Sequence, residues 1–227
     1  MKKLLFSLIS LSALNAGVYT GFDIGAAKLS QSFDENVIKN MAQFGLYLKS
    51  YKEKDSESSF VGTIKMDYNQ STYELTINNE RAYKDTFSQT SFKALVGYGF
   101  YESSSIDTSF NILLGLGVNN AKLKSSIVED SVSANANALI LGLGGLMKFG
   151  ETKQFMISFD GYYNHYTKYE DFENRSKNAI DVELGALYKF SKDDSGTFAS
   201  IKAGRKDILF SEKTGSSFVN IGLGYKF

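Results

Sequence analysis

The feature that most constrains this chain is a two-residue period of apolar side chains that recurs along most of its length. One segment is apolar at every second position: Phe92, Ala94, Val96, Tyr98 and Phe100. The segments 110–118, 180–190 and 219–227 repeat the pattern. Because successive side chains of a β-strand point to opposite faces, this period predicts strands with two different faces. No stretch after residue 16 shows a comparable helical period of 3.6 residues.

The second face of these strands is glycine-rich, small or charged. Gly97 and Gly99 occupy it in one segment, and Gly222 and Gly224 occupy it in the last. Glycine weakens a strand interior, but the narrow inside of a barrel gives it a reason to be there. The apolar face would then contact lipid, where every backbone polar group must be paired and the sheet must close. We therefore predict an all-β fold, a closed antiparallel transmembrane β-barrel, rather than a soluble sandwich.

The number of strands follows from the alternating segments. We expect ten: 18–29, 42–51, 59–68, 91–101, 109–119, 138–149, 155–165, 178–190, 197–206 and 217–227. Short polar connections alternate with longer ones, as in outer-membrane barrels with short periplasmic turns and long extracellular loops. The long connections are 30–41, 69–90, 120–137, 166–177 and 207–216. Tyr73, Leu75 and Ile77 also alternate, which favours strand extensions or a hairpin within 69–90 and leaves eight or twelve strands as alternatives.

Aromatic residues flank the short connections and predict a girdle at one membrane interface. We expect these side chains to point outward: Phe100, Phe110, Phe149, Phe155, Phe190 and Phe198. The alternative is an ordinary aromatic core in a soluble β protein, which leaves the glycine-rich face unexplained.

Composition excludes several classes of function. The chain has 25 Lys and Arg against 25 Asp and Glu, so it lacks the basic excess of a nucleic-acid binder. It has no Cys and one His, which excludes a disulfide scaffold, a Cys-ligated zinc site and any two-His metal motif. The carboxylates Glu170, Asp171 and Glu173 lack the spacing of an EF-hand loop. We therefore expect no metal and no cofactor.

The first 16 residues have the pattern of a secretory signal peptide. Lys2 and Lys3 precede an apolar stretch, residues 4–14, and small or polar residues follow at 15–17. We predict a signal peptide over 1–16 and a barrel domain over 17–227; a short amphipathic first helix is the alternative.

The C-terminal residues carry a family resemblance. Residues 220–227 place a polar residue, a glycine and two aromatic residues at alternate positions, ending in phenylalanine: Asn220, Gly222, Tyr225 and Phe227. This resembles the terminal assembly signal of bacterial outer-membrane proteins. With the export signal and the strand pattern, the chain is similar to small Gram-negative outer-membrane barrels such as OmpA-like membrane domains and opacity-type porins. The resemblance implies periplasmic chaperones, insertion by the barrel assembly machinery, contact with outer-membrane lipid and lipopolysaccharide, extracellular loops and a periplasmic C-terminus.

The alternation also predicts which ionisable residues face the lumen. There are ten, five acidic and five basic: Asp23, Lys49, Lys65, Asp67, Lys93, Asp160, Asp181, Glu183, Lys202 and Lys226. Unpaired buried charge is costly, so a balanced set in a narrow lumen is expected to pair. One hypothesis is an ion-pair network that plugs or gates the lumen, with Asp181, Glu183 and Lys202 among its members. The alternative is that pore water solvates these charges.

Two functions remain open at this point. The first is a porin-like passive channel for small solutes or a structural surface protein. The second is an adhesin or recognition barrel that binds host or matrix components through the loops 30–41, 69–90 and 120–137. We expect no enzymatic activity, because the single histidine, His165, lacks an adjacent acidic pair. We expect a monomer, because no large inward constriction loop is evident.

Overall fold

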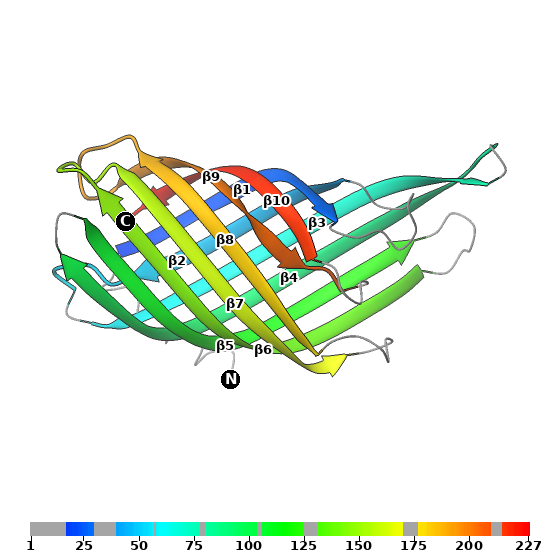
Figure 1. Ribbon diagram of the computed structural model, residues 1–227, viewed down its shortest axis with the longest axis horizontal. Helices are drawn as coiled ribbons and strands as arrows, with labels where there is room; N and C mark the ends of the chain where they lie inside the picture. The colour runs from blue at the N-terminus through cyan, green and yellow to red at the C-terminus, as the bar shows by residue number, and fades with distance from the viewer. Residues whose placement is uncertain are drawn as a thin grey trace.

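The computed structural model describes residues 17–29, 40–56, 58–77, 80–103, 106–124, 131–169, 177–209 and 215–227. The ten strands in this part of the chain are β1 (Gly17–Leu29), β2 (Met41–Tyr51), β3 (Phe60–Ile77), β4 (Glu80–Ser103), β5 (Asp107–Lys124), β6 (Ser131–Phe149), β7 (Phe155–Tyr169), β8 (Asn178–Lys189), β9 (Gly196–Asp207) and β10 (Gly215–Lys226). Consecutive strands pair antiparallel, and β1 pairs with β10 to close the barrel (Figure 1). The predicted fold class is confirmed, with ten strands rather than eight or twelve.

The largest departure from the predicted strand bounds is the long hairpin of β3 and β4. These strands pair without interruption from Phe60 opposite Tyr98 to Ile77 opposite Glu80, with one register shift after Leu75. The alternating residues within 69–90 therefore extend β3 and β4, as the strand-extension reading predicted. Figure 1 shows this hairpin reaching beyond the other strands.

The end of the hairpin extends beyond the barrel wall, because the neighbouring strands β2 and β5 do not pair with it there. The β2–β3 ladder ends at Ala42 opposite Gln70, and the β4–β5 ladder ends at Thr86 opposite Lys124. Beyond these pairs the ribbon is two-stranded in the part of the chain that the structure describes.

The opposite end of the barrel carries the short connections. Residues 150–154 join β6 to β7 in a tight turn, in which the Lys153 N–H donates to the Gly150 carbonyl oxygen (3.2 Å). Gly150 has a φ of 76°, a conformation that glycine adopts without steric penalty. The short connections at this end agree with the prediction, but two of the connections predicted to be long, 69–90 and 120–137, are mostly strand. β3 runs to Ile77 and β4 begins at Glu80, and β5 runs to Lys124 and β6 begins at Ser131.

Outward side chains form the apolar surface that the alternation predicts. Leu114, Leu184 and Ile221 are among many large hydrophobic residues that are mostly exposed on this face. A continuous exposed apolar surface of this kind fits contact with lipid. No described helix is long and apolar enough to cross a membrane.

One aromatic prediction was wrong. Phe100, Phe155 and Phe190 are exposed as expected, but Phe198 is fully buried inside the barrel. The cause is parity: Phe198 lies on the same face of β9 as Lys202, four residues along the strand, and that face points inward. There it packs with Tyr19 at a ring-centroid distance of 6.0 Å.

Some predictions concern residues that the structure does not describe. These are the signal peptide, 1–16, and the carboxylates Glu170, Asp171 and Glu173.

Candidate functional site: the filled lumen

The structure places all ten of the predicted lumen charges on the inner face of the barrel. Each is buried, with exposed fractions from 2% for Asp23 to 7% for Asp181. The inward face is set by the strand period, so these residues alternate with exposed apolar neighbours; on β8, for example, Asp181 and Glu183 flank Val182. The site is therefore an interior lined by charge rather than a surface cleft.

The central ion pairs join opposite walls of the barrel. Lys49 on β2 pairs with Asp160 on β7, with 2.5 Å between Nζ and Oδ2, and lies 3.5 Å from Glu183 on β8. Lys65 on β3 pairs with the second carboxylate oxygen of Glu183. In the barrel order, four strands separate β3 from β8 on either side, and the same holds for β2 and β7. These contacts therefore cross the full width of the lumen.

Further ion pairs extend this network. Lys206 Nζ lies 2.7 Å from Asp67 Oδ1, Lys202 Nζ lies 2.8 Å from Asp23 Oδ2, and Lys93 pairs with Asp181. Lys202 also lies 3.5 Å above the ring centroid of Tyr47, a favourable cation–π distance. Because a buried charge without a partner costs several kcal/mol, this pairing is what allows the barrel to keep charges in its interior.

Asp181, Glu183 and Lys202 all belong to the network, but their ion pairs run to other strands. The reason is register: Glu183 lies opposite Gly204, and Lys202 lies opposite Gly185. Neither charge faces the other across the β8–β9 ladder, and Lys202 pairs instead with Asp23 on β1, two strands along the barrel.

Sequence reasoning missed several interior charges. Lys206, Lys148 and Lys189 continue the inward parity of β9, β6 and β8, so a full application of the alternation would have found them. Glu53 lies in the turn after β2 and pairs with Lys148 and Lys226. No strand pattern could indicate Glu53, because it lies outside any strand.

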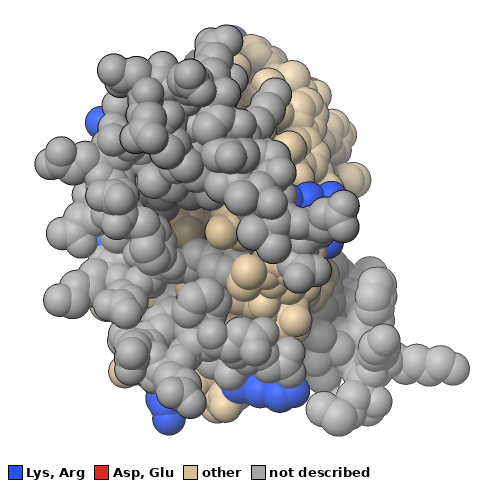
Figure 2. Space-filling view, turned by 90° about the vertical axis from the view of Figure 1, so that its right-hand side faces the viewer, with Lys and Arg blue, Asp and Glu red and all other residues tan. Residues whose placement is uncertain are grey.

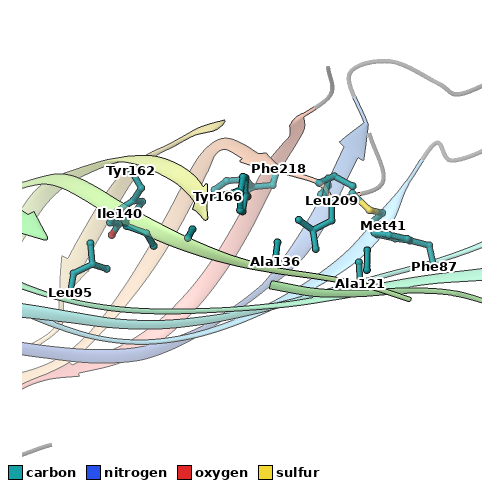
Figure 3. Packing of buried hydrophobic residues seen from close by; sticks show 14 of the residues in the cluster. Met41, Phe87, Leu95, Ala121, Ala136, Ile140, Tyr162, Tyr166, Leu209 and Phe218 are labelled. Carbon is teal, nitrogen blue, oxygen red and sulfur yellow. The ribbon is translucent and has the colours of Figure 1, made fainter. Parts of the chain in front are cut away.

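The loop end of the lumen contains an apolar cluster, which we call the mouth cluster. Its members are Met41, Phe87, Ala121, Ala134, Ala136, Tyr166, Ile208, Leu209 and Phe218. Figure 3 shows many of these side chains gathered inside the barrel. Ile208 and Leu209 come from the connection after β9 and are almost fully buried. No pattern in the sequence indicates that this connection turns inward.

Hydrogen bonds hold the inward segment 207–209 in place. The side chain of Gln89 accepts from the Leu209 N–H (2.9 Å) and donates to the Asp207 carbonyl oxygen (3.2 Å). The Tyr166 hydroxyl donates to the Asp207 carboxylate (2.6 Å), and the Asp207 N–H donates to Asp181 Oδ1 (2.7 Å). The mouth cluster is thereby connected to the ion-pair network through Asp181.

A second apolar cluster fills the turn end of the lumen. It contains Tyr19, Tyr47, Tyr51, Leu146, Met156, Leu187 and Phe198. Below it, Lys226 pairs with Asp194 in the β8–β9 turn at 2.6 Å. This hydrogen bond is the main reason that the pKa of the Asp194 carboxyl lies below its usual value.

The residues of the C-terminal signal divide between the two faces. Asn220 is buried, whereas Tyr225 and Phe227 are exposed on the outer face. A Cβ at Gly222 would lie 2.1 Å from Asp23 Oδ1, so only glycine leaves room for that carboxylate. The Phe227 N–H donates to the Val18 carbonyl oxygen (2.9 Å), which extends the seam between β10 and β1.

His165 lies apart from the interior charges. It is exposed, and its Nδ1 is 2.8 Å from Asn178 Oδ1. Asp160, on the same strand, faces the lumen and pairs with Lys49. Among the described residues, no group of three or more His, Asp or Glu side chains is placed to hold a metal ion.

Comparison with known proteins supports the fold and nothing finer. No protein-family model and no curated protein matches the chain. A solved structure that resembles it is the transport unit of the autotransporter AIDA-I from Escherichia coli, with a TM-score of 0.52, 13% identity, and coverage of 99% of this chain and 96% of that one.

Two further similar structures have lower TM-scores. The translocator domain of the autotransporter NalP from Neisseria meningitidis gives 0.48, at 12% identity and coverage of 100% and 94%. The attachment invasion locus protein Ail of Yersinia pestis, in complex with a heparin analogue, gives 0.44, at 14% identity and coverage of 94% and 98%. The likeness to the AIDA-I transport unit and the closed ten-stranded barrel confirm the expected resemblance at the level of architecture: the chain has the fold of an outer-membrane β-barrel.

Proposed function

We propose that this protein is an outer-membrane surface barrel with a closed lumen, and that its loop end acts in recognition outside the cell. The observation that carries the proposal is the filled interior. Ion pairs cross the lumen between opposite walls, and apolar clusters occupy both ends. A passive channel needs a continuous water path, which these packed side chains interrupt.

The long β3–β4 hairpin supports recognition as the function of the loop end. Short turns of outer-membrane barrels face the periplasm and long loops face outward, so the hairpin would project into the medium. Its outer edges lie beyond the last pairs with β2 and β5 that the structure describes. Exposed strand edges offer unpaired backbone groups, which partner proteins use in strand addition.

Single-channel conductance in a planar bilayer tests the closed lumen. We expect the purified full-length protein to be folded and electrically silent. The matched variant replaces Lys49, Lys65, Asp160 and Glu183 with serine, which removes two bases and two acids and leaves the net charge unchanged. We expect this variant to be silent as well, because the apolar clusters at both ends of the lumen remain in place. Discrete openings of the unaltered protein would overturn the proposal and favour a passive channel for small solutes.

Adhesion tests the recognition role. Bacteria that express the protein are compared on immobilised extracellular-matrix proteins with bacteria that express a form lacking residues 72–85. We expect the shortened form to reach the surface in equal amount and to lose adhesion. Equal adhesion by both forms would remove the hairpin from the proposal.

A further inference from the structure

Three outward residues near the loop end of the barrel form one row across three neighbouring strands. Lys28 on β1 lies opposite Ser217 on β10, and Ser217 lies opposite Arg205 on β9. All three side chains are exposed. Since adjacent strands lie about 4.8 Å apart, the row brings a lysine and an arginine within about 10 Å of each other, with a hydroxyl between them.

The arginine side chain leans over β10, the strand that carries Ser217. Its Nε lies 2.5 Å from the position that a Cβ on Gly215 would occupy. Gly215 belongs to β10, the strand between Arg205 and Lys28. A glycine at this position therefore leaves room for the arginine side chain over the strand that separates it from Lys28.

The row lies directly above the apolar outer wall. The next outward row toward the turn end is Ala26, Val219 and Ala203, and the one after it is Ile24, Ile221 and Ile201. These isoleucines are about half exposed or more and form a continuous apolar strip. The charges thus stand where the outer wall changes from apolar to polar, which is the level of lipid headgroups.

Neither cation is neutralised by the protein in the part of the chain that the structure describes. Neither Lys28 nor Arg205 has an ion pair there. The nearest acid on β9, Asp207, is hydrogen-bonded to Tyr166. Figure 2 faces this end of the barrel and shows Lys and Arg at the margin, with no Asp or Glu visible among the described residues.

A second basic pair provides a comparison within the same molecule. Lys122 and Lys124 on β5 also point outward, between Ser88 and Ser133 and between Thr86 and Ser131. A polar row, Thr90, Asn120 and Asn135, separates them from Val118, the last apolar residue on the outer face of β5. Lys122 is four residues beyond that boundary, about 13 Å along the strand, whereas Lys28 is two residues beyond Ala26.

We propose that Lys28, Ser217 and Arg205 bind a phosphate group of a lipid in the outer leaflet. Arginine and lysine match phosphate oxygens with charge-assisted hydrogen bonds, and the serine hydroxyl supplies a further donor. The apolar rows beneath the site would hold the acyl chains of the same lipid. The inference rests on the outward orientation of the loop end in the proposed function, but it does not depend on a closed lumen.

Binding of a phosphorylated glycolipid tests the site. The probes are diphosphoryl lipid A and the same glycolipid without phosphates, bound to the full-length protein in detergent and counted by native mass spectrometry. The test variant carries Lys28→Gln and Arg205→Gln, and the control carries Lys122→Gln and Lys124→Gln, with the same change of charge. We expect affinity for the phosphorylated lipid to fall about tenfold in the test variant and to stay unchanged in the control.

The remaining arms separate the possible outcomes. Binding of the phosphate-free lipid should be weak and equal in all forms, and millimolar inorganic phosphate should not displace the lipid. Equal affinity of the test variant and the unaltered protein, or equal binding of both lipids, would overturn the proposal. Displacement by free phosphate would overturn the lipid assignment. Equal unfolding temperatures of the two variants and the unaltered protein show that the substitutions leave folding intact. The conductance measurement tests the closed lumen of the proposed function and does not test this lipid site.

Discussion

At the scale of single residues, Glu183 shows how the buried charges of the lumen are paired. Its two carboxylate oxygens contact Lys65 and Lys49, which come from strands on the opposite wall. Lys49 also pairs with Asp160, whereas Lys65 pairs with Glu183 alone among the residues that the structure describes. The two lysines therefore depend on Glu183 to different extents.

Glu183→Gln is expected to destabilise the barrel by about 3–5 kcal/mol, because Lys65 keeps its charge in a buried position without its ion-pair partner. Urea unfolding in lipid vesicles measures the loss. The exposed Glu102→Gln is the control and should change stability by less than about 0.5 kcal/mol. Adding Lys65→Met to Glu183→Gln should restore much of the loss; a double variant less stable than the single one would contradict this account.

At the scale of elements, the segment 207–209 and the turn 190–195 each fold against the end of the lumen. The first is held by Gln89 and Tyr166, and the second by the bond between Asp194 and Lys226. The first contacts join a connection to β4 and β7, which do not pair with β9, and the second joins a turn to the neighbouring strand β10 through side chains. Strand pairing alone therefore creates neither.

Gln89→Leu should loosen the inward segment without affecting the barrel wall. It removes the acceptor of the Leu209 N–H and the donor to the Asp207 carbonyl. We expect the Leu209 amide to exchange hydrogen about tenfold faster, which corresponds to the loss of one or two net hydrogen bonds. Gln70→Leu, at an exposed glutamine on β3, is the control. Unchanged exchange at Leu209 would show that the mouth cluster alone holds the segment.

The bond between Asp194 and Lys226 predicts a dependence on pH. The pKa of Asp194 is lowered in the folded protein, so its contribution to stability is present above the unfolded pKa of about 3.9 and is lost as the pH falls through the folded value. The unaltered protein should therefore unfold at a higher temperature than Asp194→Asn at pH 6, and the difference should shrink below about pH 4. A constant difference down to pH 2.5 would rule out this linkage.

At the scale of the whole molecule, the barrel and its long hairpin are separable. The wall is closed by β1 and β10, and the hairpin beyond Gln70 and Thr86 adds no pairs to its neighbours among those the structure describes. On a gel, the folded and unfolded forms of the protein run as separate bands. After deletion of residues 72–85, the temperature at which the folded band converts to the unfolded one should stay within a few degrees of that of the unaltered protein. A large fall in that temperature would show that the hairpin supports the wall.

The sequence by itself determined the architecture. The two-residue period predicted the closed barrel, the ten strands and the inward position of residues such as Asp23 and Glu183. It could do so because strand geometry is local and successive side chains alternate strictly between the two faces. The same rule would have found Lys148 and placed Phe198 inside had it been followed through each strand.

Only the tertiary structure decided which charges meet and what fills the lumen. Lys65 meets Glu183 because closure brings β3 and β8 to opposite walls of a narrow barrel, a relation that no pattern within either strand contains. Leu209 lies inside because a connection folds back over the mouth, and Glu53 reaches Lys226 from a turn. Such contacts depend on distances across the closed sheet, and the physical reason they escape the sequence is that they arise only after closure.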